Sequence, residues 1–467
     1  MQDAETLKKE LFREEKSGWE GMEEAKKHEI FDYCNRYMSF LNCSKTEREF
    51  VANAKIEAEE KGFRDIATMT QIKPGDKVYY SNRDKSMYLA VIGTESIEKG
   101  IRIIGSHVDS PRLDLKPNPL YEDSGFAYFK THYYGGIKKY QWTTIPLAIH
   151  GVIVKTNGEK VTICIGEEED EPIFTITDLL PHLAQEQMEK KLKEAISGED
   201  LNVLIGNMPY DESKVSERVK LNIISIFHEK YGITEADLSS AELEVVPAFR
   251  ARSLGFDSSM VAAYGQDDKV CAYTALTALF EVENPKTTSV CILSDKEEIG
   301  SMGNTGMESH VFDAFIAELL DKAGINRPNL LEKVFVASEM LSADVDAGLD
   351  PIYAHVSEKN NAAYLGQGVG LNKYTGARGK SGASDANAEF VAKVRNIFEK
   401  NAITYKISEL GKVDVGGGGT IAYILANKGV DVIDCGIPVL SMHAPYEVTS
   451  KYDVYTAYRA YQAFWKE

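Results

Sequence analysis

Residues 102–111 read Arg-Ile-Ile-Gly-Ser-His-Val-Asp-Ser-Pro, a short apolar strand that runs directly into a histidine and an aspartate. Side chains alternate along an extended strand, so His107 and Asp109 are expected on the same side of the strand end. His107 can then bind a metal ion through one ring nitrogen while Asp109 orients the imidazole through the other. A single His-x-Asp also occurs in purely structural settings, so partners elsewhere in the chain must decide between the two roles.

The pattern around this stretch predicts an α/β fold. After residue 265, runs typical of strands alternate with runs typical of helices. The expected helices cover 268–281, 311–323, 386–401, 420–427 and 453–465, and the expected strands cover 288–294, 334–338 and 430–434. Such alternation indicates a sheet with helices on both faces.

The first half of the chain divides into a helical and a β-rich part. Residues 1–62 are predicted to be helical, with a capping box formed by Ser44 and Glu47 and a terminating glycine at Gly62. Strands are expected at 77–80, 86–92, 102–104, 126–134, 144–154 and 161–165, and helices near 183–196 and 212–231. The simplest organisation is an α/β domain of residues 1–114 and 256–467, interrupted by a β-rich domain of residues 115–255.

Composition excludes several classes of partner. The 467 residues carry a formal net charge of −19. This charge argues against binding to the phosphate backbone of nucleic acid and against docking on anionic membranes. The N-terminus is charged from the start, and no run approaches the roughly 20 apolar residues of a membrane span. Six scattered cysteines form no framework, so we expect free thiols and a cytoplasmic protein.

Four further segments place possible metal ligands after strands or at helix starts. They are Gln266-Asp267-Asp268-Lys269, Ser294-Asp-Lys-Glu297-Glu298, Ser342-Ala-Asp344 and Met442-His443-Ala-Pro-Tyr-Glu447. Three of them have an ordinary alternative: Asp at a helix start can cap it, paired acids are often solvated, and a single histidine is often structural. Open α/β sheets do, however, place their sites at such strand ends.

Taken together, these segments supply histidine, aspartate and glutamate ligands without sulfur. Nitrogen and oxygen ligands of this kind suit zinc, with manganese or cobalt tolerated. Hydrolysis by two metal ions needs a bridging water of lowered pKa and a general base beside it. Glu297, next to the candidate ligand Glu298, can be that base.

The chain resembles the aspartyl aminopeptidase / aminopeptidase I family of zinc metallopeptidases over most of its length. The matching segments are Gly105–Lys116, Tyr134–Ile137 with Trp142, Pro181–Leu183, Glu297–Ser301, Ser342–Asp344, Gly418–Ile421 and Ser441–Ala444. The resemblance implies a zinc-peptidase α/β catalytic domain with a central mixed sheet flanked by helices. It also implies that a β-rich dimerisation domain interrupts this domain, and that dimers assemble into a tetrahedral dodecamer.

The resemblance also implies roles for individual residues. Two zinc ions per subunit would be bound by His107, Asp267, Glu298, Asp344 and His443, with Asp267 as the bridge. Glu297 would be the general base and Asp109 the residue that orients His107. His182 is similar to a histidine that the β-rich domain lends to the active site of a neighbouring subunit.

The resemblance is looser at the substrate pocket. Aspartyl-specific relatives have a histidine three residues after the Asp344 position, where this chain has Ala347. The basic and tyrosine substrate contacts are matched only loosely, by Lys373, Tyr374 and Lys380 in a glycine-rich stretch, and Gly418 is a further candidate substrate contact. We therefore expect an aminopeptidase with a neutral or broad preference, as in the aminopeptidase I branch. The alternatives are an aspartyl-specific aminopeptidase, a two-metal carboxypeptidase or N-deacylase, and a catalytically inactive scaffold.

Overall fold

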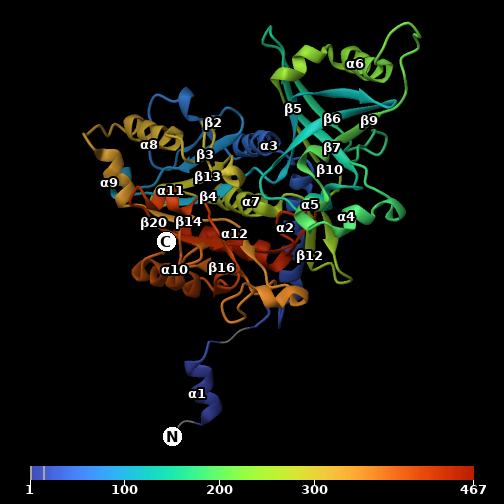
Figure 1. Ribbon diagram of the computed structural model, residues 1–467. Helices are drawn as coiled ribbons and strands as arrows, with labels where there is room; N and C mark the ends of the chain where they lie inside the picture. The colour runs from blue at the N-terminus through green and yellow to red at the C-terminus, as the bar shows by residue number, and fades with distance from the viewer. Residues whose placement is uncertain (1–2, 14–15) are drawn as a thin grey trace.

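A nine-stranded mixed sheet forms the centre of the molecule (Figure 1). The structure is a computed structural model, and it describes residues 3–13 and 16–467. In sheet order the strands are β1 (Arg64–Asp65), β2 (Lys77–Asn82), β3 (Ser86–Val91), β13 (Ser289–Ser294), β4 (Arg102–His107), β14 (Glu339–Ser342), β20 (Asp431–Gly436), β16 (Val369–Asn372) and β18 (Tyr405–Ser408). β4 runs parallel to both of its neighbours, β13 and β14. The expected α/β fold with a central mixed sheet is confirmed.

Helices cover both faces of this sheet, because successive strand residues point to opposite sides. Ile104, Cys291 and Leu341 share one apolar core with α2, α3, α7, α10 and α12, while their neighbours Ile103 and Met340 share another with α8, α9 and α11. The helices are α1 (Ala4–Leu11), α2 (Glu24–Asn42), α3 (Glu47–Glu60), α7 (Gln266–Phe280), α8 (Val311–Lys322), α9 (Leu330–Val336), α10 (Ala388–Lys400), α11 (Ala422–Ala426) and α12 (Lys451–Lys466).

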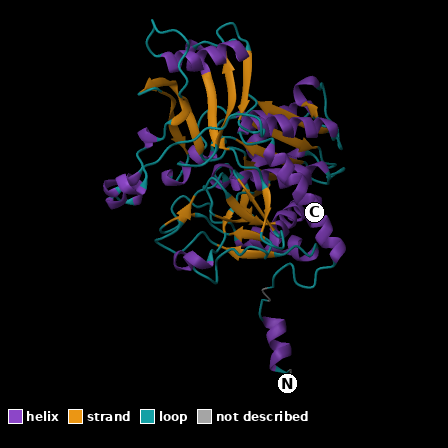
Figure 2. Cartoon of the chain, turned by 90° about the vertical axis from the view of Figure 1, so that its right-hand side faces the viewer, coloured by secondary structure: helices purple, strands orange, loops and turns teal. Residues whose placement is uncertain are grey.

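A six-stranded antiparallel sheet stands beside this layered body (Figure 2). Its strands, in order, are β8 (Lys160–Ile165), β7 (Leu147–Val154), β10 (Ala241–Pro247), β5 (Arg112–Asp123), β6 (Phe126–Tyr134) and β9 (Val203–Gly206). The sheet has its own apolar core, to which α6 (Arg218–Tyr231) contributes Phe227. The short helices α4 (Gln185–Glu189) and α5 (Leu192–Ala195) belong to the same part of the chain.

Two smaller sheets complete the fold. The five-stranded sheet contains β11 (Arg252–Leu254), β12 (Met260–Ala263), β22 (Glu447–Ser450), β21 (Pro438–Leu440) and β15 (Asp346–Ala347). The two-stranded sheet pairs β17 (Gly376–Ala377) with β19 (Gly417–Gly418). Among the described residues, no helix combines the length and the apolar character that a membrane crossing requires.

Residues 334–338 are not a strand, contrary to the sequence prediction. Most of them lie in α9, and the strand β14 begins only at Glu339. The buried residues of α9 are Leu330, Val334 and Phe335, a spacing that fits one face of a helix. A short apolar run does not by itself distinguish a buried strand from a buried helix.

Two helix predictions also need correction. The capping box of α3 is formed by Thr46 and Glu49, two residues later than the expected Ser44 and Glu47. The single helix expected at 183–196 is broken into α4 and α5. All residues of α4 and α5 are exposed or half-buried, so no packed apolar face holds one longer helix together.

Candidate metal centre

Three adjacent parallel strands end at one edge of the central sheet. Ser294 at the end of β13 pairs with His107 at the end of β4, and Ser342 at the end of β14 pairs with Gly105. The segments that follow β13 and β14 carry Glu297 and Asp344, so both come next to His107. This carboxyl edge is where open α/β sheets place their ligands.

The five-stranded sheet brings in the remaining two residues. Asp267 follows β12 and His443 lies between β21 and β22, and β12 and β22 pair through Ala263 and Glu447. The carboxylate of Glu447 accepts hydrogen bonds from the backbone N–H groups of His443, at 2.8 Å, and Asp267, at 3.1 Å. Glu447 therefore fixes both segments relative to each other.

The carboxylate of Asp267 lies between the two imidazoles. Its Oδ1 is 3.2 Å from Nε2 of His107, and its Oδ2 is 3.1 Å from Nε2 of His443. Asp344 adds a carboxylate oxygen 3.8 Å from Nε2 of His107, and Glu298 adds one 3.6 Å from Nε2 of His443. The result is two neighbouring groups of nitrogen and oxygen ligands that share Asp267.

The chemistry of these residues fits zinc, which nitrogen and carboxylate oxygen ligands bind. The groups His107/Glu297/Asp344 and His107/Asp267/Glu298 each bring one potential ligand atom per residue within 4.8 Å of the others. Oε1 of Glu298 is buried and has no hydrogen-bond partner among the described residues, as expected for an oxygen that a cation would satisfy. The side chain of His107 is 2% exposed and that of His443 is 35% exposed, so the centre opens on the His443 side.

Asp109 contacts the imidazole of His107 and the segment that carries Glu297 and Glu298. Nδ1 of His107 lies 3.0 Å from the backbone carbonyl oxygen of Asp109 and 3.3 Å from its Oδ1, and the carboxylate accepts hydrogen bonds from the N–H groups of Glu297 and Glu298. Burial raises the pKa of Asp109, but the hydrogen bond with His107 and the charges of His107 and Arg112 lower it below its usual range. Asp109 thus stays ionised, which suits a residue that supports a metal ligand.

Glu297 reaches the centre without being fully enclosed. Its Oε2 lies 3.9 Å from Nε2 of His107, and 19% of its side chain is exposed. Burial raises the pKa of Glu297 to about 7, against the opposing charge of His107 and with support from Asp109 and Asp267. A carboxylate in this position can take up and return a proton at the open side of the centre.

Sequence reasoning assigned no role to three residues that shape the centre. The hydroxyl of Tyr134 donates a hydrogen bond to Asp109, and the carbonyl of Gly136 lies 2.9 Å from Nδ1 of His443. Gly135 has a φ of +73°, and a Cβ there would meet Oε2 of Glu298 at 3.2 Å, so a side chain would crowd this ligand. The motif Tyr134–Ile137 is the sequence signal for these contacts.

His182, Lys373 and Gly418 form no hydrogen bond or ion pair with this cluster of side chains in the described part of the chain. His182 is exposed on a short 3-10 helix at Pro181–Leu183. Gly418 pairs with Gly376 in the two-stranded sheet, a few residues beyond Lys373. Lys373 and Lys380 both form ion pairs with Asp385, at 3.4 and 3.2 Å.

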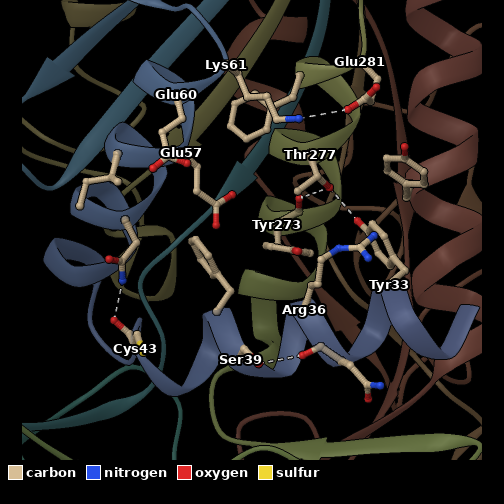
Figure 3. Close-up of a pocket in the computed structure, with 16 residues that line it drawn as sticks. Tyr33, Arg36, Ser39, Cys43, Glu57, Glu60, Lys61, Tyr273, Thr277 and Glu281 are labelled. Carbon is tan, nitrogen blue, oxygen red and sulfur yellow. Dashed lines mark hydrogen bonds and ion pairs between the residues drawn. The ribbon is translucent and has the colours of Figure 1, made fainter. Parts of the chain in front are cut away.

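A separate cavity of about 860 Å³ lies among α2, α3, α7 and α12, and its lining contains none of the metal-centre residues (Figure 3). Glu57 from α3 and Tyr273 from α7 contribute to its wall, and Lys61 pairs with Glu281 at 3.5 Å. The chemistry described above is therefore not located in this cavity.

Comparison with known proteins gives consistent matches over the chain. The family described as aminopeptidase I zinc metalloprotease (M18) matches residues 40–465. A probable M18 family aminopeptidase 1 from Clostridium acetobutylicum is 51% identical over 97% of this chain and 99% of its own length. The crystal structure of an M18 family aminopeptidase from Thermotoga maritima superposes with a TM-score of 0.94, at 43% identity, over 97% of this chain and 100% of that one. Aminopeptidase I from Clostridium acetobutylicum superposes with a TM-score of 0.92, at 48% identity, over 98% of this chain and 100% of that one.

Proposed function

The chain belongs to the M18 family of aminopeptidase I zinc metalloproteases and is a metal-dependent aminopeptidase; from this premise we propose how its centre works and which substrates it prefers. We propose that each subunit binds two zinc ions. His107 and Asp344 would hold one, His443 and Glu298 the other, with Asp267 between them. The position of the Asp267 carboxylate between two imidazoles is the observation that carries this assignment.

Zinc held at these residues lowers the pKa of water and polarises the scissile carbonyl group. Residues of the chain transfer the proton and hold the ligands in position. Glu297 accepts a proton from the attacking water and returns it to the nitrogen of the leaving amine. Asp109 holds His107 in one orientation throughout, and Glu447 keeps Asp267 and His443 at a fixed separation. Manganese or cobalt can replace zinc, because the ligands are nitrogen and oxygen atoms only.

The preferred N-terminal residue is proposed to be neutral, or broad rather than acidic. Lys373 and Lys380, the basic residues that a side-chain carboxylate of the substrate would need, are both paired with Asp385. Lys380 also lies over the ring of Tyr374, at 3.9 Å from its centroid. Asp385 balances one of these two positive charges, so the group attracts an acidic side chain less strongly than two unpaired lysines would. Ala347 adds no positive charge to this region.

This preference is tested with peptides that differ only in their first residue, assayed with zinc, manganese and cobalt. We expect higher kcat/KM for leucine or alanine than for aspartate or glutamate at that position. A clear preference for aspartate would instead support the aspartyl-specific alternative. The same peptides with an acetylated N-terminus serve as the control. They should not be cleaved, and cleavage of them would favour a carboxypeptidase or N-deacylase.

We further propose that subunits assemble as dimers into a tetrahedral dodecamer, in which His182 reaches the centre of a neighbouring subunit. Support comes from the apolar surroundings of His182: Leu180 is 50% exposed and Leu183 is 69% exposed, an arrangement that a partner would cover. The S. cerevisiae protein mApe1, 22% identical to this chain and alike in fold, forms a dodecamer.

A further inference from the structure

A second group of metal-ligand side chains lies where α3 meets the six-stranded sheet. It consists of Glu49 in the first turn of α3, His150 on β7 and Cys164 on β8. His150 and Cys164 are directly paired across the two antiparallel strands, so their side chains share one face of the sheet. None of these residues belongs to the metal centre described above.

The potential ligand atoms of these three residues all lie within 4.8 Å of one another. Nδ1 of His150 is 2.7 Å from Oε1 of Glu49. The imidazole is 2% exposed, whereas Cys164 is an exposed free cysteine. A metal ion could therefore enter from the Cys164 side, and a water molecule could occupy the remaining position.

The surroundings hold these side chains in place. Oε2 of Glu49 accepts hydrogen bonds from the backbone N–H groups of Lys45, at 3.0 Å, and Thr46, at 3.1 Å, which leaves Oε1 directed at His150. On the other side of the imidazole, Nε2 lies 3.0 Å from Oε1 of Glu167. Histidines that bind metal ions usually donate their other N–H to such a carboxylate, which fixes the ring and strengthens the ligand.

We propose that Glu49, His150 and Cys164 bind one zinc ion, which would clamp α3 to the six-stranded sheet. Thiolate, imidazole and carboxylate are the ligand types that zinc uses in proteins. Lys45 is the opposing charge: its Nζ lies 2.5 Å from Oε1 of Glu167, so it acts most strongly on this outer carboxylate and less strongly on Glu49 and Cys164. Binding releases the thiol proton of Cys164 and a proton of His150 to solvent, so occupancy rises with pH.

The negative surroundings that favour a proton on His150 also favour a zinc ion. Burial lowers the pKa of His150, but its contacts with Cys164, Glu167 and Glu49 outweigh burial and raise the pKa well above its usual value. Zinc would replace this proton and the thiol proton, and it would contact Glu49 and Cys164 directly.

Cobalt tests this site independently of the aminopeptidase centre, whose ligands contain no sulfur. The full-length protein, with its catalytic centre already loaded with zinc, is titrated with Co²⁺ and followed by near-ultraviolet absorption. We expect a sulfur-to-cobalt charge-transfer band in the unsubstituted protein and its loss in Cys164→Ser. Cys43→Ser is the matched control, since Cys43 and Cys164 are the two exposed cysteines of the described chain. The control should keep the band.

Metal content gives a second readout that does not depend on activity. At equal zinc and after desalting, the unsubstituted protein and Cys43→Ser should retain about one zinc ion per chain more than Cys164→Ser. Cys164 is exposed, so its replacement leaves the core and the capping box of α3 intact. No charge-transfer band at excess Co²⁺, a band that persists in Cys164→Ser, or equal zinc contents would each overturn the proposal.

Discussion

The hydroxyl of Tyr134 donates a 2.9 Å hydrogen bond to Oδ2 of Asp109. Tyr134 ends β6 of the six-stranded sheet, whereas Asp109 follows β4 of the central sheet. Since the other oxygen of Asp109 lies 3.3 Å from Nδ1 of His107, a residue of the second sheet holds the carboxylate that contacts this imidazole.

Replacing Tyr134 by phenylalanine should therefore weaken the centre without disrupting the fold. We expect a loss of about 10- to 100-fold in zinc affinity or in kcat/KM. Losses of this size are usual when a residue that supports a metal ligand from outside the ligand set is changed. Zinc titration and steady-state kinetics measure this effect. Tyr133→Phe is the control, because Tyr133 is 43% exposed and its change should leave both quantities unaltered. If the zinc affinity and kcat/KM of Tyr134→Phe equalled those of the wild type, the hydrogen bond from Tyr134 to Asp109 would not support the centre.

Replacing Glu297 by glutamine should separate catalysis from metal binding. Glutamine cannot accept the proton, so kcat should fall by about 100-fold or more, while zinc content stays at the wild-type level. Glu298→Gln provides the contrast, since a proposed ligand is changed there and zinc should be lost. Metal analysis beside kinetics distinguishes the two variants. A Glu297→Gln protein that retained normal turnover would show that another group is the base.

His182 can be tested by mixing subunits. His182→Ala and Glu297→Gln should each be inactive alone, but a mixed dimer contains one site with an intact Glu297 and a His182 from its neighbour. If subunits combine at random in dimers, an equal mixture should recover about a quarter of wild-type activity. Refolding or co-expression of the two variants, followed by an activity assay, measures this recovery. No recovery from verified mixed dimers would argue that His182 does not act between subunits.

The ion pairs of Glu47 should make stability depend on pH. Glu47 is fully buried, and its carboxylate lies 3.4 Å from Arg112 and 3.2 Å from Lys85. Burial raises the pKa of Glu47, but the two cations outweigh it and lower the pKa below its usual range. Because this pKa is lower in the folded state, the stabilisation is complete near neutral pH and is lost as the pH falls below about 4.

Glu47→Gln should accordingly be less stable than wild type at pH 7, by about 1–3 kcal/mol. The difference should shrink in acid, where wild-type Glu47 also becomes protonated. Thermal unfolding of both proteins between neutral and acidic pH gives the comparison. Glu60→Gln is a suitable control, since Glu60 is exposed at the rim of the cavity in Figure 3 and forms no ion pair within the described part of the chain. A difference that stayed constant with pH would show that the charge of Glu47 is not responsible.

Much of the fold was predictable because its signals are local. The strands at 77–80, 86–92 and 126–134 and the helices at 311–323 and 386–401 follow from the spacing of apolar residues, and the structure has corresponding elements there. The strand predicted at 334–338 was wrong, because five apolar-rich residues fit either element. Packing against the neighbouring helices favours the helix α9 over a strand in this segment.

The sequence by itself determined which residues could bind metal ions and that they follow strands, since both depend on residue type and local pattern. His107, Glu297 and Asp344 meet because β13, β4 and β14 end at one edge, which the α/β pattern implies. The family resemblance implied Asp267 as the bridging residue, and the tertiary structure places its carboxylate between both imidazoles. Only the tertiary structure decided that Tyr134 and Glu447 support the centre. Such roles depend on the direction of side chains from segments far apart in the chain, and no local pattern carries that information.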